Sequence, residues 1–402
     1  MMAVMKHNYL LLILVFLVGI QLPAQVSGSF GKGFNYEAID KSFSLKFGLR
    51  IQPLLSVNYR DFESFTDPSL DEIQMSIRRA RLKFDGYAFN PNIVYKLELA
   101  LGSRNLGGTD QHTNFAARLV LDAVLKWQFA PDFYLWFGQT KLPGNRERVI
   151  SSQKLQFVDR SIVNGRYNID RDVGFQLHIK KKLAANPLNL AFAVSMGEGR
   201  NITDFNAGGL EYTGRIEYLP FGAFKNKGDY SEGDLEREQT IKTSIGVTFD
   251  YNHDAVRQRG NQGAYIVDSN NRLVTQSLST WFVDMITKYK GWALEAEYAN
   301  KSAPQPVFYE GDQRVNAFYT GWGFTTQTSY LLKSNWEFGL RYSYVHPDVD
   351  VDVKLGNQTQ FTAVISKYVF GHNLKVQSDI SYSTYQLVDG EWQFRLQVEL
   401  AL

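Results

Sequence analysis

Hydrophobic and polar residues alternate along most of this 402-residue chain, in runs of about ten positions that begin at Phe43. Successive side chains of a β-strand point to opposite faces, so this period of two predicts strands with one apolar and one polar face. In the clearest run every second residue from Phe115 to Phe129 is apolar. We predict sixteen strands, at residues 43–51, 76–86, 92–102, 115–129, 132–140, 172–183, 188–197, 209–219, 240–251, 279–289, 292–300, 317–330, 336–345, 359–369, 374–382 and 392–402.

The connections between these runs alternate between short and long. Short ones include 130–132 and 289–291, and long ones include 58–73, 141–171 and 252–278. This arrangement is typical of an outer-membrane barrel, with short periplasmic turns and long extracellular loops. The connection 221–239 departs from it, because it occupies the place of a short turn but is long and highly charged.

A soluble β-sandwich would show the same alternation with its apolar side packed inward. Strand length and aromatic position favour the barrel, since many runs reach the ten or so residues that cross a bilayer and aromatic rings gather near their ends. The last run keeps its alternation up to Leu402. We therefore predict an all-β fold: a 16-stranded antiparallel transmembrane β-barrel over residues 43–402, in the outer membrane of a Gram-negative bacterium.

The first 24 residues have the features of a secretory signal peptide. Lys6 precedes an unbroken apolar run from Tyr9 to Val18, and Ala24 suits a cleavage site. The apolar core is shorter than the roughly 20 residues of a membrane-spanning helix. Residues 25–42 are then an N-terminal lead segment before the barrel.

Charge and chemistry exclude several functions. The formal net charge is +2, and it falls to +1 without residues 1–24, which hold one lysine and no acid, so we expect no nucleic-acid partner. The six histidines form no local pattern with a nucleophile, and we expect neither an enzyme nor a cofactor. Asp348, Asp350 and Asp352 alternate but lack a glycine-containing calcium loop, so we interpret them as a hydrated rim rather than a metal site.

The run 76–86 carries unusual positive charge for a strand. In a bilayer the apolar faces of a closed barrel meet lipid, so Leu82 and its neighbours of the same parity face outward. An arginine facing lipid at mid-depth would cost about 2 to 4 kcal/mol. We therefore expect Arg79, Arg81 and Lys83 to face the lumen, with Arg78 at the point where the alternation slips.

The long connection 141–171 contains apolar residues, such as Val149, Phe157 and Ile162, that a hydrated external loop does not need. We infer that it folds back into the barrel and narrows the pore, the alternative being an external loop held by salt bridges. Guanidinium groups in a constriction select anions, and their forked donors fit phosphate or carboxylate. Its basic residues are Lys141, Arg146, Arg148, Lys154, Arg160, Arg166 and Arg171.

Four stretches, at residues 77–82, 137–143, 157–161 and 170–174, together resemble the phosphate-selective porin family, porins O and P, and the similarity extends over most of the chain. The resemblance implies a barrel that is usually a homotrimer, a third external loop folded inward, and an arginine ladder that leads to a lysine-containing anion site. By this resemblance, Arg78, Arg79 and Arg81 correspond to the wall arginines, and Arg146, Arg148 and Arg160 to the constriction loop.

We expect an outer-membrane diffusion porin with a preference for small anions, including phosphate or polyphosphate. Two alternatives remain open: a barrel that acts as a surface binding or attachment protein, and an unselective nutrient pore. Lys83, Lys96 and Lys126 are the lysines whose parity places them in the lumen. The candidate pore-lining residues are Arg78, Arg79, Arg81, Lys83, Lys126, Arg146, Arg148, Lys154, Arg160 and Arg171.

Overall fold

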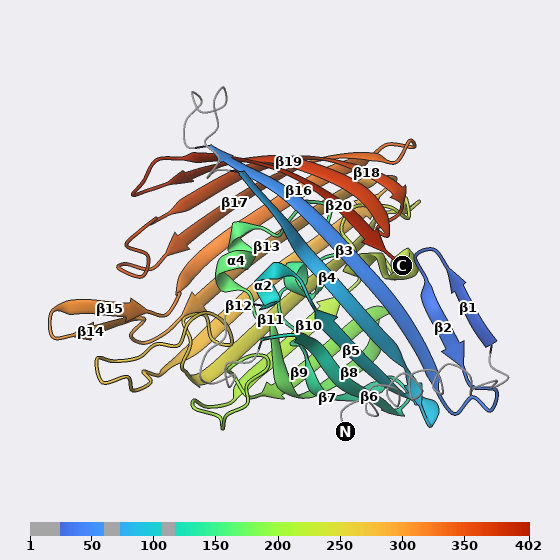
Figure 1. Cartoon of the computed structure of the whole chain (residues 1–402), viewed down its shortest axis with the longest axis horizontal. Coiled ribbons are helices and arrows are strands. Elements are labelled where there is room, and N and C mark those ends of the chain that lie inside the picture. Colours follow the sequence, from blue (N-terminus) through green and yellow to red (C-terminus); the bar gives the residue numbers. More distant parts are fainter. Residues whose placement is uncertain (1–24, 60–72, 107–116) are drawn as a thin grey trace, which may run out of the picture.

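The computed structural model describes residues 25–59, 73–106 and 117–402, and within them sixteen antiparallel strands close into a barrel (Figure 1). Closure occurs where β20 pairs with β3, with Ala401 opposite Arg50 and Trp392 opposite Tyr59. The predicted barrel is confirmed, and the predicted signal peptide lies outside the described residues. The barrel strands are β3 (Ser44–Tyr59), β4 (Ile73–Ala88), β5 (Asn90–Ala100), β6 (Val120–Ala130), β7 (Phe133–Lys141), β8 (Arg171–Leu183), β9 (Asn186–Ser195), β10 (Glu211–Tyr218), β11 (Lys242–Ala255), β12 (Gln276–Tyr289), β13 (Trp292–Ser302), β16 (Gly321–Leu331), β17 (Trp336–Pro347), β18 (Gln358–Phe370), β19 (Leu374–Tyr385) and β20 (Glu391–Ala401).

The two largest differences from the predicted strand boundaries occur in β3 and β6. The first strand continues beyond residue 51 to Tyr59, because Leu54 next to Leu55 hides the alternation in that part of β3. The run predicted from residue 115 becomes a strand only at Val120, and its first two residues lie outside the described ranges. Both differences arise at strand ends, where the apolar pattern carries the least information.

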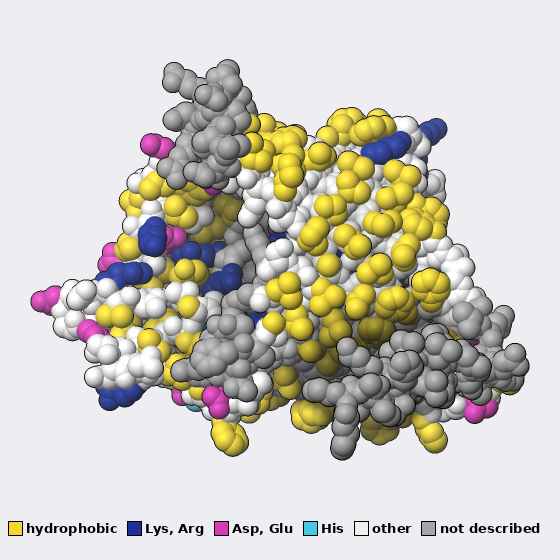
Figure 2. All heavy atoms as spheres, in the orientation of Figure 1, with side chains coloured by type: hydrophobic (Ala, Val, Ile, Leu, Met, Phe, Trp, Pro, Cys, Tyr) yellow, Lys and Arg dark blue, Asp and Glu magenta, His cyan; other side chains and the backbone are white. Residues whose placement is uncertain are grey.

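The apolar surface of the barrel faces outward and its polar surface faces inward. Ile216, Val283 and Leu340 are among many exposed hydrophobic side chains, whereas Thr280 and Asp284, on inward-facing positions of β12, are buried. Hydrophobic side chains cover the wall seen in Figure 2, and charged ones gather toward one end. This arrangement excludes a sandwich with an apolar core and is that of a barrel surrounded by lipid. Among the described residues, no helix has the length and apolar character to cross a membrane.

Short turns join the strands at one end of the barrel. Lys290 and Gly291, between β12 and β13, have φ angles of 48° and 94°, as a two-residue type I′ hairpin requires. The exception is the connection 219–241 between β10 and β11, which contains the 3₁₀ segment η4 (Lys225–Tyr230). The other end carries longer loops, including the hairpin of β14 (Val307–Glu310) and β15 (Gln313–Ala317).

The lead segment before the barrel forms a hairpin of β1 (Gln25–Ser29) and β2 (Gly33–Glu37). β2 pairs with β3 over residues 44–47, beyond the point where β20 ends, so the hairpin extends the sheet at the short-turn end (Figure 1). Phe30 packs edge-on against Phe370 with ring centroids 5.1 Å apart, which fixes the hairpin tip near the turn between β18 and β19 (Leu374–Tyr385).

The lipid-facing wall gives a first prediction. Val247→Arg, which replaces an exposed apolar side chain in the middle of β11, should lower the free energy of unfolding by about 2 to 4 kcal/mol. Ile241→Arg, just before the same strand, should cost only about 0 to 1 kcal/mol, because the penalty falls toward the interface. Urea unfolding in lipid vesicles measures both, and equal costs would contradict the assignment of this face to lipid.

Candidate functional site in the barrel lumen

The connection between β7 and β8, residues 142–170, lies inside the barrel, and we call it the inner loop. It contains two short helices, α3 (Arg146–Val149) and α4 (Ile162–Tyr167). Val163 and Tyr167 of α4 pack with Phe282 and Val345 of the wall in one buried cluster. These contacts account for the apolar residues that predicted an inward fold, and α4 is visible within the barrel in Figure 1.

Arg146 fixes the inner loop to the wall. Its Nε donates to Asp284 Oδ1 at 2.8 Å, and its Nη2 donates to Glu217 Oε1 at 2.5 Å and to Ser244 Oγ at 2.9 Å. Arg146 is 1% exposed, so its charge is fully used by these partners. The expectation that Arg146 lines the pore differs from this placement, since the side chain points into the wall of β10 to β12 rather than into a cavity.

Further bonds hold the rest of the inner loop against the same side of the barrel. Lys375 Nζ on β19 donates to the carbonyl oxygen of Leu155 at 2.5 Å, and Ser329 Oγ on β16 donates to Gln156 Oε1 at 2.9 Å. Arg341 Nη1 on β17 donates to the carbonyl oxygen of Asp159 at 2.9 Å. These bonds hold the loop against β10 to β19. On the side of β3 to β8, Ser152 and Asp159 still bond to arginines of β3 and β4, but a cavity remains.

A cavity of about 340 Å³ occupies that open side, in the half of the barrel that carries the long loops. Its described lining contains nine basic side chains and two carboxylates, those of Asp159 and Asp170. We call it the arginine cavity. Its basic residues are Arg78, Arg79, Arg81, Lys141, Arg148, Arg160, Arg171, Arg200 and Arg259.

A bulge in β4 directs neighbouring arginines of the wall toward this cavity. The register with β3 passes from Gln52–Arg79 to Pro53–Ile77, so Arg78 is the extra residue, at the point where the sequence alternation slips. A bulge re-aims side chains. Arg78 Nη2 and Arg79 Nη2 both reach Asp159 of the inner loop, at 2.5 and 2.9 Å. Burial alone would raise the pKa of the Asp159 carboxyl, but Arg79 and Arg78 hold the pKa well below its usual value, so it remains ionised.

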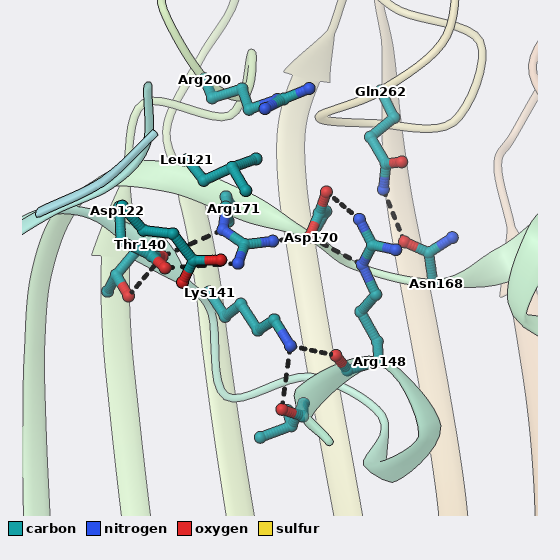
Figure 3. A network of polar contacts seen from close by, with 12 residues as sticks. Leu121, Asp122, Thr140, Lys141, Arg148, Asn168, Asp170, Arg171, Arg200 and Gln262 are labelled. Carbon is teal, nitrogen blue, oxygen red and sulfur yellow. Dashed lines mark hydrogen bonds and ion pairs between the residues drawn. The ribbon is translucent and has the colours of Figure 1, made fainter. Parts of the chain in front are cut away.

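A second ionic network borders the cavity beside β7 and β8 (Figure 3). Arg171 Nε donates to Asp122 Oδ1 at 2.9 Å, and Arg171 Nη1 lies 3.4 Å from Asp170 Oδ1. Arg148 also donates to Asp170, and Lys141 Nζ donates to the carbonyl oxygen of Arg148 at 2.7 Å. Burial opposes ionisation of Asp170, yet the two arginines lower its pKa. Both carboxylates of the cavity are therefore already shared between pairs of arginines.

Three other cations face the cavity with neutral partners. Arg160 donates to the carbonyl oxygens of Glu147 and Ile150, both at 2.7 Å. Arg200 Nη2 donates to Asn105 Oδ1 at 3.0 Å, and in Figure 3 its guanidinium lies above the network without a bond to the other residues drawn. Arg259 Nη1 donates to the carbonyl oxygen of Gly165 at 2.5 Å. Since carbonyl and amide oxygens carry no net charge, the charges of these three arginines are left uncompensated, whereas Arg81 is paired with Glu98 at 2.7 Å.

Lys83 and Lys154 line a second cavity, of about 460 Å³, at the short-turn end. Arg50 and Lys288 also line it, and Arg81 and Lys83 lie on the same face of β4, so the two cavities follow one another along the wall. We call it the lysine cavity. Lys126 lines neither cavity, because its Nζ lies 3.6 Å from the centre of the Trp136 ring.

Sequence reasoning missed Arg200 and Arg259 as lining residues and named Lys141 only as part of the long connection. Arg200 and Arg259 belong to two other loops, and no spacing pattern links them to β4 or to the inner loop. Their common position arises only when the barrel closes. No group of His, Asp or Glu side chains in the described ranges is arranged to hold a metal ion.

The anchoring of the inner loop gives a second prediction. Arg146→Met should lower the free energy of unfolding by about 3 to 5 kcal/mol, because Arg215 alone then compensates the two buried carboxylates of Glu217 and Asp284 and one negative charge is left without a partner. Arg272→Met is the control, since this exposed arginine forms only a solvent-screened pair and should change stability little. Urea titration in detergent micelles measures both variants. A loss no greater than that of the control would show that Arg146 does not anchor the loop.

Comparison with known proteins also identifies porins. The family model described as phosphate-selective porin O and P matches residues 49–390. No curated protein matches the chain in sequence. Among solved structures, OmpT of Vibrio cholerae is 11% identical with a TM-score of 0.55, covering 94% of this chain and 100% of that one. Pseudomonas putida OprB is 12% identical with a TM-score of 0.58 (90% and 95% covered), and an anion-selective porin from Comamonas acidovorans is 9% identical with a TM-score of 0.54 (90% and 100%). At these identities the solved structures establish the barrel fold alone.

Proposed function

Because the chain belongs to the phosphate-selective porin O and P family, we propose that this outer-membrane porin is a diffusion channel that prefers anions. The observation that carries the proposal is the lining of the arginine cavity, where nine basic side chains face two carboxylates that are already paired. Fixed positive charge in a narrow lumen lowers the energy of an anion that has lost part of its hydration shell and raises that of a cation.

A path for the solute follows from the order of the cavities. Arg200 and Arg259 attract an anion on the long-loop side, and the guanidinium groups of β4 and the inner loop then replace part of its hydration. From Arg81 the anion passes to Lys83 and the lysine cavity, on the periplasmic side. The path needs no chemical step, so the proposal assigns no catalytic residue.

Phosphate and polyphosphate are the solutes that this lining fits best. The forked donors of arginine form paired hydrogen bonds with tetrahedral oxyanions, whereas a spherical halide offers no matching geometry. The anchor Arg146 and the lysine stacked on Trp136, Lys126, have no part in this path, in contrast to the other eight candidate residues. A homotrimer, implied by the resemblance in sequence, belongs to the same proposal.

A third prediction tests the uncompensated charge. The double variant Arg200→Gln and Arg259→Gln should shift the reversal potential in a potassium chloride gradient toward cations, because it removes two cavity charges that have neutral partners. The matched control is Arg272→Gln with Arg314→Gln, two arginines that lie outside both described cavities. Planar-bilayer recording measures the potentials. If both double variants shift the potential equally, the cavity charge does not set the preference.

A fourth prediction concerns the solute. Phosphate added to a chloride solution should reduce the chloride current of a single channel at concentrations far below that of chloride, because a bound oxyanion occupies the arginine cavity. Sulfate is the control for a second tetrahedral oxyanion, and nitrate for a planar one. Reduction by phosphate and sulfate but not nitrate supports tetrahedral recognition. A chloride current that does not respond to any of them would leave a general anion channel without an oxyanion site.

A further inference from the structure

The connection 219–241 is rich in charge, yet four of its carboxylates are buried. Asp229, Glu232, Asp234 and Glu238 are 7%, 2%, 0% and 1% exposed. Leu219 and Phe224 pack with Ile286 of β12 in a small buried cluster, so the segment turns into the barrel at the periplasmic end. Burial of four carboxylates is costly unless each meets donors, so their partners show what the segment holds.

The connection is hydrogen-bonded to the inner loop from the periplasmic side. The backbone nitrogen of Glu232 donates to the carbonyl oxygen of Lys154 at 2.9 Å, and the backbone nitrogen of Gln156 donates to Glu232 Oε2 at 2.8 Å. In addition, Arg146 Nη1 donates to the carbonyl oxygen of Asp229 at 2.9 Å. The inner loop is therefore bonded to this segment at Arg146 and again at Lys154 and Gln156.

The same segment reaches across the lumen to distant strands. Tyr230 OH donates to Glu217 Oε2 on β10 at 2.7 Å, and Lys288 Nζ on β12 donates to the carbonyl oxygen of Ser231 at 2.7 Å. Ser231 Oγ lies 2.9 Å from His372 Nε2, in the turn between β18 and β19. Arg237 Nη1 donates to the carbonyl oxygen of Leu331, where β16 ends, at 2.8 Å. These bonds extend from β10 to β19, and on the side of β3 and β4 the segment borders the lysine cavity instead.

On the described strands behind these contacts, inward-facing acids outnumber inward-facing cations, which are Arg215, Lys288, Lys301 and Arg341. The inward-facing carboxylates are buried at 5% exposure or less, in contrast to the basic lining of the arginine cavity. A solute path through this side would favour cations, because carboxylate rings select them. The carboxylates are those of Glu217 on β10, Asp284 on β12, Glu295 and Glu297 on β13, and Glu337 on β17.

We propose that residues 219–241 form an internal shelf that closes the acid-lined side of the lumen and positions the inner loop, so that solutes pass only along the cation-lined side. The inference deepens the proposed channel function and rests on it. The shelf is a positioning element, since it contacts the loop and the wall and leaves recognition of the anion to the arginines. It explains why the connection between β10 and β11 is long and buries four carboxylates.

A fifth prediction tests the shelf. Replacement of residues 221–240 by an Asn-Gly turn should raise the size limit for neutral polyethylene glycols in single-channel recordings and shift the reversal potential toward cations. Gln239→Ala, an exposed position of the same segment, is the control and should change neither quantity. Polymer exclusion does not depend on solute charge, so it separates failure of the shelf from failure of anion preference. A folded deletion variant with an unchanged size limit overturns the proposal.

Thiol labelling keeps the test decisive if the deletion variant does not fold. The chain has no cysteine, so two variants each supply a single thiol: Ser329→Cys, beside Glu337, which lies against Gly233 of the shelf, and Gln153→Cys, in the lysine cavity. A neutral methanethiosulfonate reagent is added from the periplasmic side. It should modify Ser329→Cys at about one tenth of the rate of Gln153→Cys, or more slowly still, because labelling of a covered residue requires local opening. Glu232→Ala in the same background should reduce the difference. Equal rates at both positions in the intact channel overturn the proposal.

Discussion

The structure depends on one constraint, which is that hydrocarbon satisfies neither backbone hydrogen bonds nor charges. Strands in a bilayer must therefore pair all the way round, and β20 completes the circle with β3. The same constraint turns ionic side chains inward, where they meet at close range in a small volume. Every charge in this lumen is then either neutralised by a partner or available to a solute, and the distribution of the two kinds decides what the channel does.

The inner loop compensates the charges of the lumen more completely on one side of the barrel than on the other. On the side of β10 to β19 its backbone and Arg146 bond to carboxylates and amides of the wall, and that side is filled. Toward β3 to β8 it supplies Asp159 and Asp170, two acids among many arginines, and leaves space. In the channel that we propose, this unequal packing, together with the contacts of residues 219–241, leaves positive charge exposed to solutes.

Much of the fold could be predicted because the bilayer imposes a period of two on the sequence. The alternation placed Arg79 and Arg81 in the lumen, and its slip at Arg78 coincides with the bulge that brings two arginines to one carboxylate. The apolar residues of the long connection predicted its inward fold for the same reason, since they need a dry surface. Strand ends were less certain, as Leu54 shows, because an inward-facing apolar residue removes the alternation.

The sequence by itself therefore determined the barrel, the side of most strand residues and the entry of the inner loop, since these follow from local polarity. Only the tertiary structure decided which charges remain free. Arg146 and Arg148 are two residues apart, yet Arg146 is neutralised by Glu217 and Asp284, 71 and 138 positions away, while Arg148 lines the cavity. Arg200 and Arg259 join it from separate loops. Compensation of a charge depends on distances in space, and closure of the barrel sets those distances between residues far apart in the chain.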